Sequence, residues 1–234
     1  MKLKDPLIIG EFVKRPNRFL AKVLVKGEEV LAHVPNTSRL SELTIPGTRV
    51  GVSYHDDENR KTKYSLRMME KGAEWFSIDS QLPNDLVEEA LKNNVIKVGA
   101  NARSIEREKT FGNSRFDFRL QDETGNTLFI EVKGVTLEMD GEGHFPGAPT
   151  SRGVKHLKEL AEAVSQGHKG AVVFVLQFNG AKAMRPNWNL DPLFSETLKE
   201  VSSKGVEVLA YACDVTLEEI TVVRQVPVIL DDYR

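Results

Sequence analysis

The sequence predicts an α/β fold (α+β overall) in two parts, a small N-terminal β-barrel followed by an α/β domain built on a mixed sheet. Three observations lead to this prediction. The first 80 residues are a run of short apolar segments separated by turn-forming residues, as in small barrels. After residue 80, helical and strand patterns alternate. The run from Ala171 to Phe178 is apolar almost throughout, which is typical of a strand buried on both faces. We therefore expect a barrel at 1–80 and an α/β domain at 81–234.

The composition is that of an ordinary globular protein. Of the 234 residues, 40% are hydrophobic and 28% are charged, which suits two small domains. No membrane segment is present, and charge returns at Glu11, too early for a signal-peptide core, so we expect a cytoplasmic protein without a membrane partner. Cys213 is the only cysteine, which excludes an intrachain disulfide and a multi-cysteine zinc site. Its apolar neighbours predict a buried strand position.

The two parts differ in charge, although the net charge is only -2. Residues 1–80 hold 14 Lys and Arg against 11 Asp and Glu, whereas the remainder holds 18 against 23, so the parts carry +3 and -5. This balance argues against a globally basic nucleic-acid-binding protein. The acidic part could still bind DNA locally, through a few basic residues and a bound metal.

Four segments of the first part alternate or cluster apolar residues and therefore predict strands. They cover residues 7–13, 18–25, 28–34 and 49–55, and turn-forming residues separate them. Five or so short strands in about eighty residues favour an OB-fold, a barrel that binds nucleic acids through basic residues and stacking aromatic rings.

One segment of this barrel has the composition of a nucleic-acid-binding surface. Basic, polar and aromatic side chains follow one another there: Lys14, Arg15, Asn17, Arg18 and Phe19. The alternative is a solvated hairpin tip whose Phe19 points into the barrel. The segment from 35 to 40, which contains Arg39, is a second candidate.

A polar stretch with a proline, residues 77–85, follows Trp75 and Phe76 and is the expected domain junction. A helix is expected from Asp85 to Asn93, because its apolar residues recur at helical spacing. Residues 104–111 then lead through a glycine turn into a hairpin, which gives three consecutive antiparallel strands.

Residues 115–133 form that hairpin, around which the second domain is organised. Both arms alternate apolar and polar residues, and the sequence DETGN between them supplies the turn. With the turn centred on Thr124, the numbers of cross-strand partners sum to 248. Six apolar side chains then share one core face: Phe116, Phe118, Leu120, Leu128, Ile130 and Val132. Asp117 faces Glu131 on the other side, with Cβ atoms about 5 Å apart.

Two opposed carboxylates are destabilising, so something must compensate their charge. One interpretation is a solvated strand face neutralised by Arg115, Arg119 and Lys133. The other is a divalent cation, Mg²⁺ or Mn²⁺, held between Asp117 and Glu131 and completed by water and phosphate oxygens. Lys133 would project from the same face, where an ammonium could orient attacking water or offset charge on a phosphate.

A β-α-β crossover is expected beyond the hairpin. The glycine-rich stretch 138–150 is expected to be a loop, whose part from 141 to 150 overhangs the carboxylates. A helix from Ser151 to Gln166 buries one apolar stripe and places Arg152, His156 and Glu159 on the opposite, polar side. The buried strand 171–178, a helix from Leu193 to Ser203 and a strand over 205–215 complete the domain.

The spacing D-x13-E-V-K resembles the PD-(D/E)xK nuclease signature. Longer strings are more specific: AHVPNTSRLSELTIPGTRV, FGNSRFDFRL and EVKGVTLEMDGEGHFPGAPTSRGVKHLKEL resemble the sugar fermentation stimulation protein A (SfsA) family over nearly the whole chain. The resemblance implies an OB-fold joined to a restriction-endonuclease-like domain, with DNA binding. It also implies Mg²⁺ or Mn²⁺ at Asp117 and Glu131, with Lys133 completing a catalytic set.

The resemblance adds candidates and two departures. Glu108 matches a family position ahead of the Asp strand and becomes a candidate third metal ligand; the alternative is an exposed strand residue or ion-pair partner. Thr150, Arg152 and His156 match T-x-R-G-x-x-H. Arg152 near a helix N-terminus could contact phosphate, although a solvated helix face is the alternative. His144 and His156 lack a second histidine at metal-ligand spacing. The chain departs from the family pattern with Gly147 in place of an acid and Ser38 in place of glycine.

Three hypotheses follow. The first is a DNA-binding protein with a metal-dependent phosphodiesterase (nuclease) site, in which RNA is an alternative substrate. The second is a non-catalytic DNA-binding regulator of sugar (maltose) metabolism that uses the same fold. The third keeps the hairpin purely structural. The sequence leaves strandedness and oligomeric state open.

Overall fold

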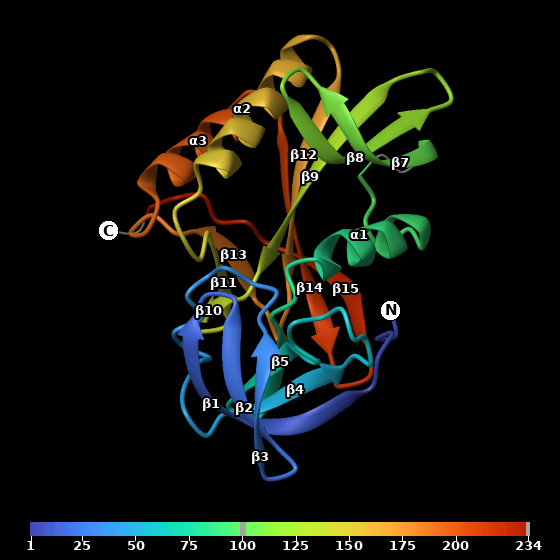
Figure 1. Cartoon of the computed structure of the whole chain (residues 1–234). Coiled ribbons are helices and arrows are strands. Elements are labelled where there is room, and N and C mark those ends of the chain that lie inside the picture. Colours follow the sequence, from blue (N-terminus) through green and yellow to red (C-terminus); the bar gives the residue numbers. More distant parts are fainter. Residues whose placement is uncertain (99–101, 233–234) are drawn as a thin grey trace.

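The first part of the chain forms a closed barrel in a computed structural model that describes residues 1–98 and 102–232 (Figure 1). Its strands are β1 (Leu7–Asn17), β2 (Leu20–Val25), β3 (Glu28–His33), β4 (Arg49–Tyr54) and β5 (Tyr64–Lys71). β1 pairs with β2 and β4, and β3 and β4 both pair with β5, so the sheet closes on itself. A sixth strand, β6 (Glu74–Ser77), adds to β5. The predicted N-terminal barrel is confirmed.

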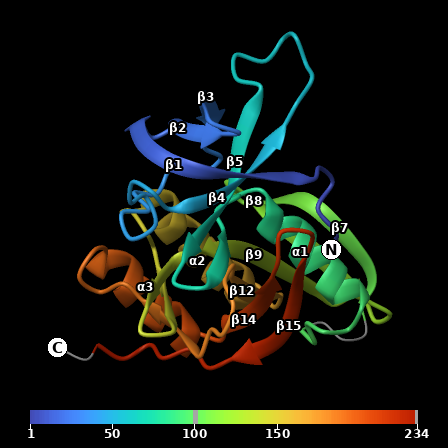
Figure 2. The same ribbon diagram turned by 90° about the horizontal axis from the view of Figure 1, so that it is seen from below.

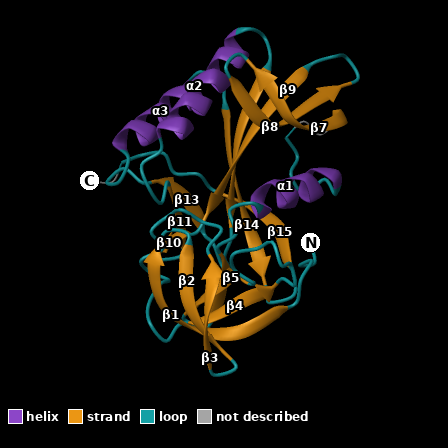
Figure 3. Ribbon diagram, viewed as in Figure 1, coloured by secondary structure: helices purple, strands orange, loops and turns teal. Residues whose placement is uncertain are grey.

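The second part is built on a mixed six-stranded sheet in the order β15-β14-β12-β9-β8-β7 (Figure 3). β7 (Ala102–Phe111), β8 (Ser114–Asp122) and β9 (Thr127–Val135) form the predicted antiparallel meander. β12 (Lys169–Leu176) and β14 (Glu207–Val215) run parallel to β9. β15 (Ile220–Val226), which we had not predicted, closes the edge antiparallel to β14. The mixed-sheet α/β architecture is confirmed.

Three helices cover the two faces of this sheet. α1 (Leu82–Lys92) packs on β9 and β15, whereas α2 (Ser151–Ser165) packs on β12 and on α3 (Pro192–Ser203). Seen from below, α1 and α3 lie on opposite sides of the central strands (Figure 2). Thr150 caps α2 by accepting the N–H of Gly153 at 3.0 Å, as its position before the helix predicts. None of the helices in the described ranges is long and apolar enough to cross a membrane.

The glycine-rich stretch after Lys133, which we expected to be a loop, is mostly strand. β10 (Leu137–Met139) and β11 (Glu142–Phe145) form a hairpin, and β11 also pairs in parallel with β13 (Ala183–Pro186). Gly141, with φ of +85°, makes the tight reversal between β10 and β11. The loop prediction was wrong because β13, the strand that completes this small sheet, lies forty residues away in sequence. Only residues 146–150 connect without regular structure.

The barrel and the mixed sheet share packed contacts. The rings of Phe76 and Phe178 stack with centroids 5.1 Å apart. The buried Gln177 side chain donates hydrogen bonds to Ser77 Oγ at 3.1 Å and to the Asp79 carbonyl at 3.0 Å. These contacts hold the barrel in a fixed position relative to the end of β12.

Candidate metal and nucleic-acid site

The β8–β9 hairpin has the predicted register over its outer part. Phe118 pairs with Ile130 and Leu120 with Leu128, so each pair sums to 248 as predicted. The pairing stops at Phe118. The strands therefore separate at the level of Asp117, the residue that precedes Phe118 in β8.

At Phe116, the core face of the hairpin differs from the prediction. We placed Phe116 on one face with Phe118, but the two side chains enter different hydrophobic clusters. The Phe116 ring lies 5.6 Å from that of Phe129 and 6.3 Å from that of His156, on the α2 side of the sheet. The expected pairing of Phe116 with Val132 was wrong because the ladder is interrupted there.

The Asp117 carboxylate occupies the gap between the separated strands. Its Oδ2 accepts the backbone N–H of Val132 at 2.7 Å, in place of a ladder bond, and its Oδ1 accepts from Asn84 Nδ2 of α1 at 2.8 Å. Burial, followed by the nearby charge of Glu131, raises the pKa of Asp117 above its usual range. Asp117 and Glu131 are thus brought together. They meet where the pairing of β8 with β9 is interrupted, and not as paired residues of the ladder as predicted.

Glu131 is buried, with 3% of the residue exposed. Its Oε1 accepts from Lys133 Nζ at 2.5 Å and is also contacted by His156 Nδ1. Burial raises the pKa of Glu131. The His156 hydrogen bond and the Lys133 charge together lower it by more, so the pKa lies below its usual range. Its Oε2 is buried and has no hydrogen-bond partner among the described residues. A buried carboxylate oxygen without a donor is costly unless a cation completes it.

The sequence pattern also placed His156 wrongly. We expected it on the polar side of α2, but it is 5% exposed and faces Glu131. Arg152 Nε, which always carries hydrogen, lies 3.4 Å from His156 Nε2, so Nε2 accepts. Nδ1 therefore carries the ring hydrogen and donates to Glu131. Helical periodicity gave no signal for this contact, and the resemblance to T-x-R-G-x-x-H singled out the residue without indicating its partner.

The donor set suits a hard divalent ion. The available ligands are two carboxylates, and no group of three His, Cys, Asp or Glu side chains in the described ranges converges to hold a metal. Zinc sites use three or four protein ligands, whereas Mg²⁺ accepts one or two carboxylates and keeps water. Each Asp117 oxygen keeps a further lone pair beyond its one hydrogen bond, and Glu131 Oε2 keeps both.

Glu108, the candidate third ligand, is not brought to the carboxylate pair. Its side chain is 61% exposed, and its carboxylate lies 3.3 Å from Arg115 Nη1. Its backbone has a φ of +54°, a left-handed conformation in the middle of β7 at the level where Asp117 leaves the ladder. The structure therefore places Glu108 as an exposed ion-pair partner, the alternative that we had weighed.

Arg15 of the barrel candidate is occupied by backbone contacts. Its Nη1 donates to the carbonyls of Ser38 at 2.7 Å and Arg39 at 2.9 Å, and its Nη2 to those of Arg18 at 2.7 Å and Asn36 at 2.6 Å. Burial lowers the pKa of Arg15. This side chain joins the two candidate barrel segments and has little capacity left for a phosphate.

The other candidate nucleic-acid-binding residues of the barrel lie around Arg15. Asn17 Oδ1 accepts the Phe19 N–H at 2.9 Å and so fixes the turn. Phe19 is 46% exposed, contrary to the alternative in which it points into the barrel, and the Arg18 guanidinium lies 4.7 Å from its ring centroid. Arg39 is exposed on the neighbouring loop.

The two departures from the family pattern lie against each other. A Cβ built on Gly147 would lie 3.1 Å from Ser38 Oγ and 3.3 Å from Ser38 Cβ. The short connection from β11 to α2 therefore touches the barrel loop that Arg15 holds. Our expectation that this connection overhangs the carboxylates stays a prediction.

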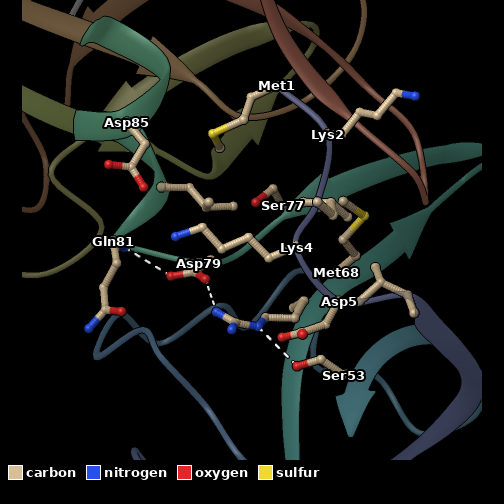
Figure 4. A pocket seen from close by; sticks show the side chains of 14 residues that line it. Met1, Lys2, Lys4, Asp5, Ser53, Met68, Ser77, Asp79, Gln81 and Asp85 are labelled. Atoms are coloured by element: carbon tan, nitrogen blue, oxygen red, sulfur yellow. Dashed lines mark hydrogen bonds and ion pairs between the residues drawn. The ribbon is translucent and has the colours of Figure 1, made fainter. Parts of the chain in front are cut away.

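A pocket of about 150 Å³ lies elsewhere, between the N-terminal segment, β5 and the start of α1 (Figure 4). Within it, Arg67 Nε donates to Ser53 Oγ at 3.2 Å, and Arg67 Nη1 pairs with the buried Asp79. Asp79 Oδ1 accepts the Gln81 N–H at 2.9 Å. None of the candidate site residues lines this pocket. Its charged pair anchors the segment that joins β6 to α1.

Comparisons with known proteins agree with this two-part organisation. Residues 13–78 match the family model described as the SfsA N-terminal OB domain, and residues 81–219 match the sugar fermentation stimulation protein RE domain. Sugar fermentation stimulation protein homologs of Clostridium acetobutylicum and Clostridium perfringens are 45% and 48% identical over 98% of this chain and 100% of their own length. A structure of Pyrococcus furiosus SfsA in complex with Ca²⁺ is 29% identical, with a TM-score of 0.87 over 98% of this chain and 99% of that one.

Proposed function

The chain belongs to the sugar fermentation stimulation protein family, and on that premise we propose that it is a DNA-binding protein that hydrolyses phosphodiesters with a divalent metal, Mg²⁺ or Mn²⁺. The observation that carries the proposal is the orphaned Oε2 of Glu131, buried beside the Asp117 carboxylate. The Pyrococcus furiosus relative binds Ca²⁺, a hard cation of the same ligand preference.

Asp117 and Glu131 would hold the metal, Glu131 through Oε2. The metal would supply a bound water of lowered pKa and would stabilise charge on the phosphoryl oxygens. Glu131 Oε1 is already occupied by Lys133 and His156, which leaves Oε2 as the oxygen available to a metal. Asn84 and the Val132 N–H fix Asp117 in the same way. The protein therefore orients both carboxylates before any ligand arrives.

Lys133 has the catalytic role in this proposal. Its Nζ lies 2.5 Å from Glu131 Oε1, and its side chain is 14% exposed, so the ammonium is held at the carboxylate by a side chain that keeps some contact with solvent. From that position it can hold a water for in-line attack and offset the charge that develops on the phosphate. Such an interaction acts mainly in the transition state, so its removal should lower the rate more than binding.

DNA binding would use exposed basic and aromatic side chains of the barrel and of α2. Arg18, Phe19 and Arg39 of the barrel and Arg152 of α2 present cations and one aromatic ring to solvent. Arg15 supports this surface by holding its backbone.

A metal titration monitored by thermal unfolding tests the proposed site. A ligand that binds only the native state stabilises it by about 2.7 kcal/mol at a concentration one hundred times Kd. Mn²⁺ should raise the melting temperature of the wild type, whereas Asp117→Asn and Glu131→Gln should abolish the rise. Glu108→Gln is the matched control, since Glu108 pairs with Arg115 away from the site, and its response should equal that of the wild type. A metal-independent melting temperature in the wild type would remove the metal site.

A further inference from the structure

Three segments that touch one another are free of acidic residues. They are the tip segment (residues 12–21), the barrel loop (34–41) and the α2 approach (143–158), which together contain seven Lys and Arg and no Asp or Glu. The chain has 32 Lys and Arg in all, so the remaining residues hold 25 against all 34 Asp and Glu. Glu11, Glu42, Glu142 and Glu159 flank these segments directly; Glu142 pairs with Arg185, and Glu159 lies 3.8 Å from Lys155. Positive charge therefore prevails only within the segments themselves, as a local basic surface that could follow a polyanion.

Arg15 joins the first two segments into one surface. Its guanidinium donates to carbonyls of the tip segment and of the barrel loop, all at 2.6–2.9 Å. The backbones of Arg39 and Arg18 are therefore held by the two terminal nitrogens, Nη1 and Nη2, of a single guanidinium. Phe19, 46% exposed, lies beside them with Arg18 stacked on its ring. An exposed aromatic ring framed by arginines is the arrangement on which unpaired bases stack.

The barrel loop continues into the α2 approach. Ser38 lies against Gly147, and the loop is on the side of the barrel that faces β11 and the chain leading into α2 (Figures 1 and 2). Five residues beyond Gly147, at most about 18 Å of chain, Arg152 contacts His156, which contacts Glu131. Side-chain contacts at both ends and the short chain from Gly147 to Arg152 between them thus connect Phe19 with the carboxylate pair.

We propose that these three segments form one binding surface for an unpaired DNA strand, with a base stacked on Phe19 and phosphates on Arg18, Arg39 and Arg152. A strand anchored on the barrel then presents a phosphodiester at Glu131 and Lys133. The surface rests on the DNA binding of the proposed function, and this last step rests also on the proposed hydrolysis. A duplex fits less well, because its bases cannot stack on Phe19 and because Glu131 and Lys133 are recessed, with side chains 4% and 14% exposed.

Fluorescence anisotropy in metal-free buffer measures this surface without cleavage. The probes are labelled single-stranded DNA of increasing length, the blunt duplex of the same sequence and the matching RNA. Phe19→Ala and Phe19→Leu should each weaken single-strand binding by about tenfold or more, since base stacking contributes about 1–3 kcal/mol. Leu31→Ala, which removes another exposed apolar side chain of the barrel, is the control and should change nothing.

The continuity of the surface is tested with strand length and salt. Arg39→Ala and Arg152→Ala should each reduce the log-log salt slope by about 0.7, the value for one phosphate contact on a single strand. Arg103→Ala, an exposed charge on β7, should not. Arg152→Ala should weaken binding of long strands and leave short ones, anchored on the barrel alone, unaffected.

Two results would overturn the inference: Phe19 variants that bind single strands as the wild type does, or an Arg152 effect that is independent of strand length. A duplex bound as tightly as the single strand and equally weakened by Phe19→Ala would also contradict it. Tighter binding of the matching RNA than of single-stranded DNA would contradict the choice of DNA as the bound strand. Absence of cleavage in Mn²⁺ with intact single-strand binding would instead refute the proposed hydrolysis and leave this surface standing.

Discussion

Substitution of His156 tests how Glu131 is held. The ring is 5% exposed, its Nδ1 contacts Glu131 Oε1 and its Nε2 accepts from Arg152. An asparagine amide nitrogen lies two bonds beyond Cβ, as Nδ1 does, so His156→Asn can keep the donor to Glu131. A glutamine amide lies one bond further out, near the Nε2 position. His156→Gln therefore keeps the contact with Arg152 and loses the donor, and His156→Ala loses both.

The expected loss can be estimated in two ways. A hydrogen bond to a charged group contributes about 1.5–3 kcal/mol, and substitution of a group that orients a metal ligand costs about 10- to 100-fold in metal affinity. Because tenfold corresponds to about 1.4 kcal/mol, the two estimates agree. Lys133 still holds Oε1 in these variants, so we expect the lower half of this range.

The assay is calorimetric titration of metal-free protein with Mn²⁺. His156→Ala and His156→Gln should bind about 10- to 30-fold more weakly, and His156→Asn should stay within about threefold of the wild type. An asparagine variant as weak as the alanine variant would refute the hydrogen-bond reasoning. Unchanged affinity in all three would show that His156 does not position Glu131.

Three further predictions concern the supporting structure. Arg15→Ala should lower the free energy of unfolding by about 2–3 kcal/mol in urea, since four carbonyls lose a charged donor, whereas Arg18→Ala should change it by less than about 0.5 kcal/mol; equal effects would contradict the structural role of Arg15. Gly134→Ala should lower the free energy of unfolding by about 1–3 kcal/mol, and with it the melting temperature, because its Cβ would lie 2.5 Å from Gln177 Oε1. An unchanged melting temperature would show that the Gln177 side chain moves aside. Asp117 has a raised pKa, so in metal-free protein its contribution to stability is present below the unfolded pKa of about 3.9 and is lost as pH rises through the folded pKa. The stability of Asp117→Asn relative to wild type should therefore increase as pH rises above about 4, measured by urea unfolding at each pH, and a pH-independent difference would contradict the shift.

The fold was predictable where local pattern and tertiary structure agree. Alternation in β8 and β9 predicted the register of the outer part of the hairpin, from Phe118 to Leu128, and the apolar run of β12 identified the central strand. β10 and β11 were missed because their glycine-rich sequence reads as a loop and their partner β13 is remote. Sequence periodicity describes a strand or helix in isolation, so it cannot show a strand that is stabilised by a distant partner.

The candidate site was predictable in its residue types and less so in its geometry. Asp117, Glu131 and Lys133 were expected together and lie together, but the break in the ladder at Asp117 depends on a side chain that replaces a backbone hydrogen bond. The burial of His156 was missed because a polar residue on α2 reads as solvent-facing unless its buried acidic partner is known. The four hydrogen bonds of Arg15 were missed for a related reason. Their acceptors are backbone carbonyls, which every residue has, so the sequence does not indicate them.

Metal-dependent cleavage by the wild type and Lys133→Ala tests the central claim most directly. Labelled single-stranded and duplex DNA and RNA would be incubated with excess protein across Mg²⁺ and Mn²⁺ concentrations, and the single-turnover rate measured. The account predicts cleavage by the wild type and a rate at least about 100-fold lower for Lys133→Ala, with metal and DNA affinity nearly unchanged. Absence of cleavage of every substrate by the wild type, or equal rates for the two proteins, would contradict it.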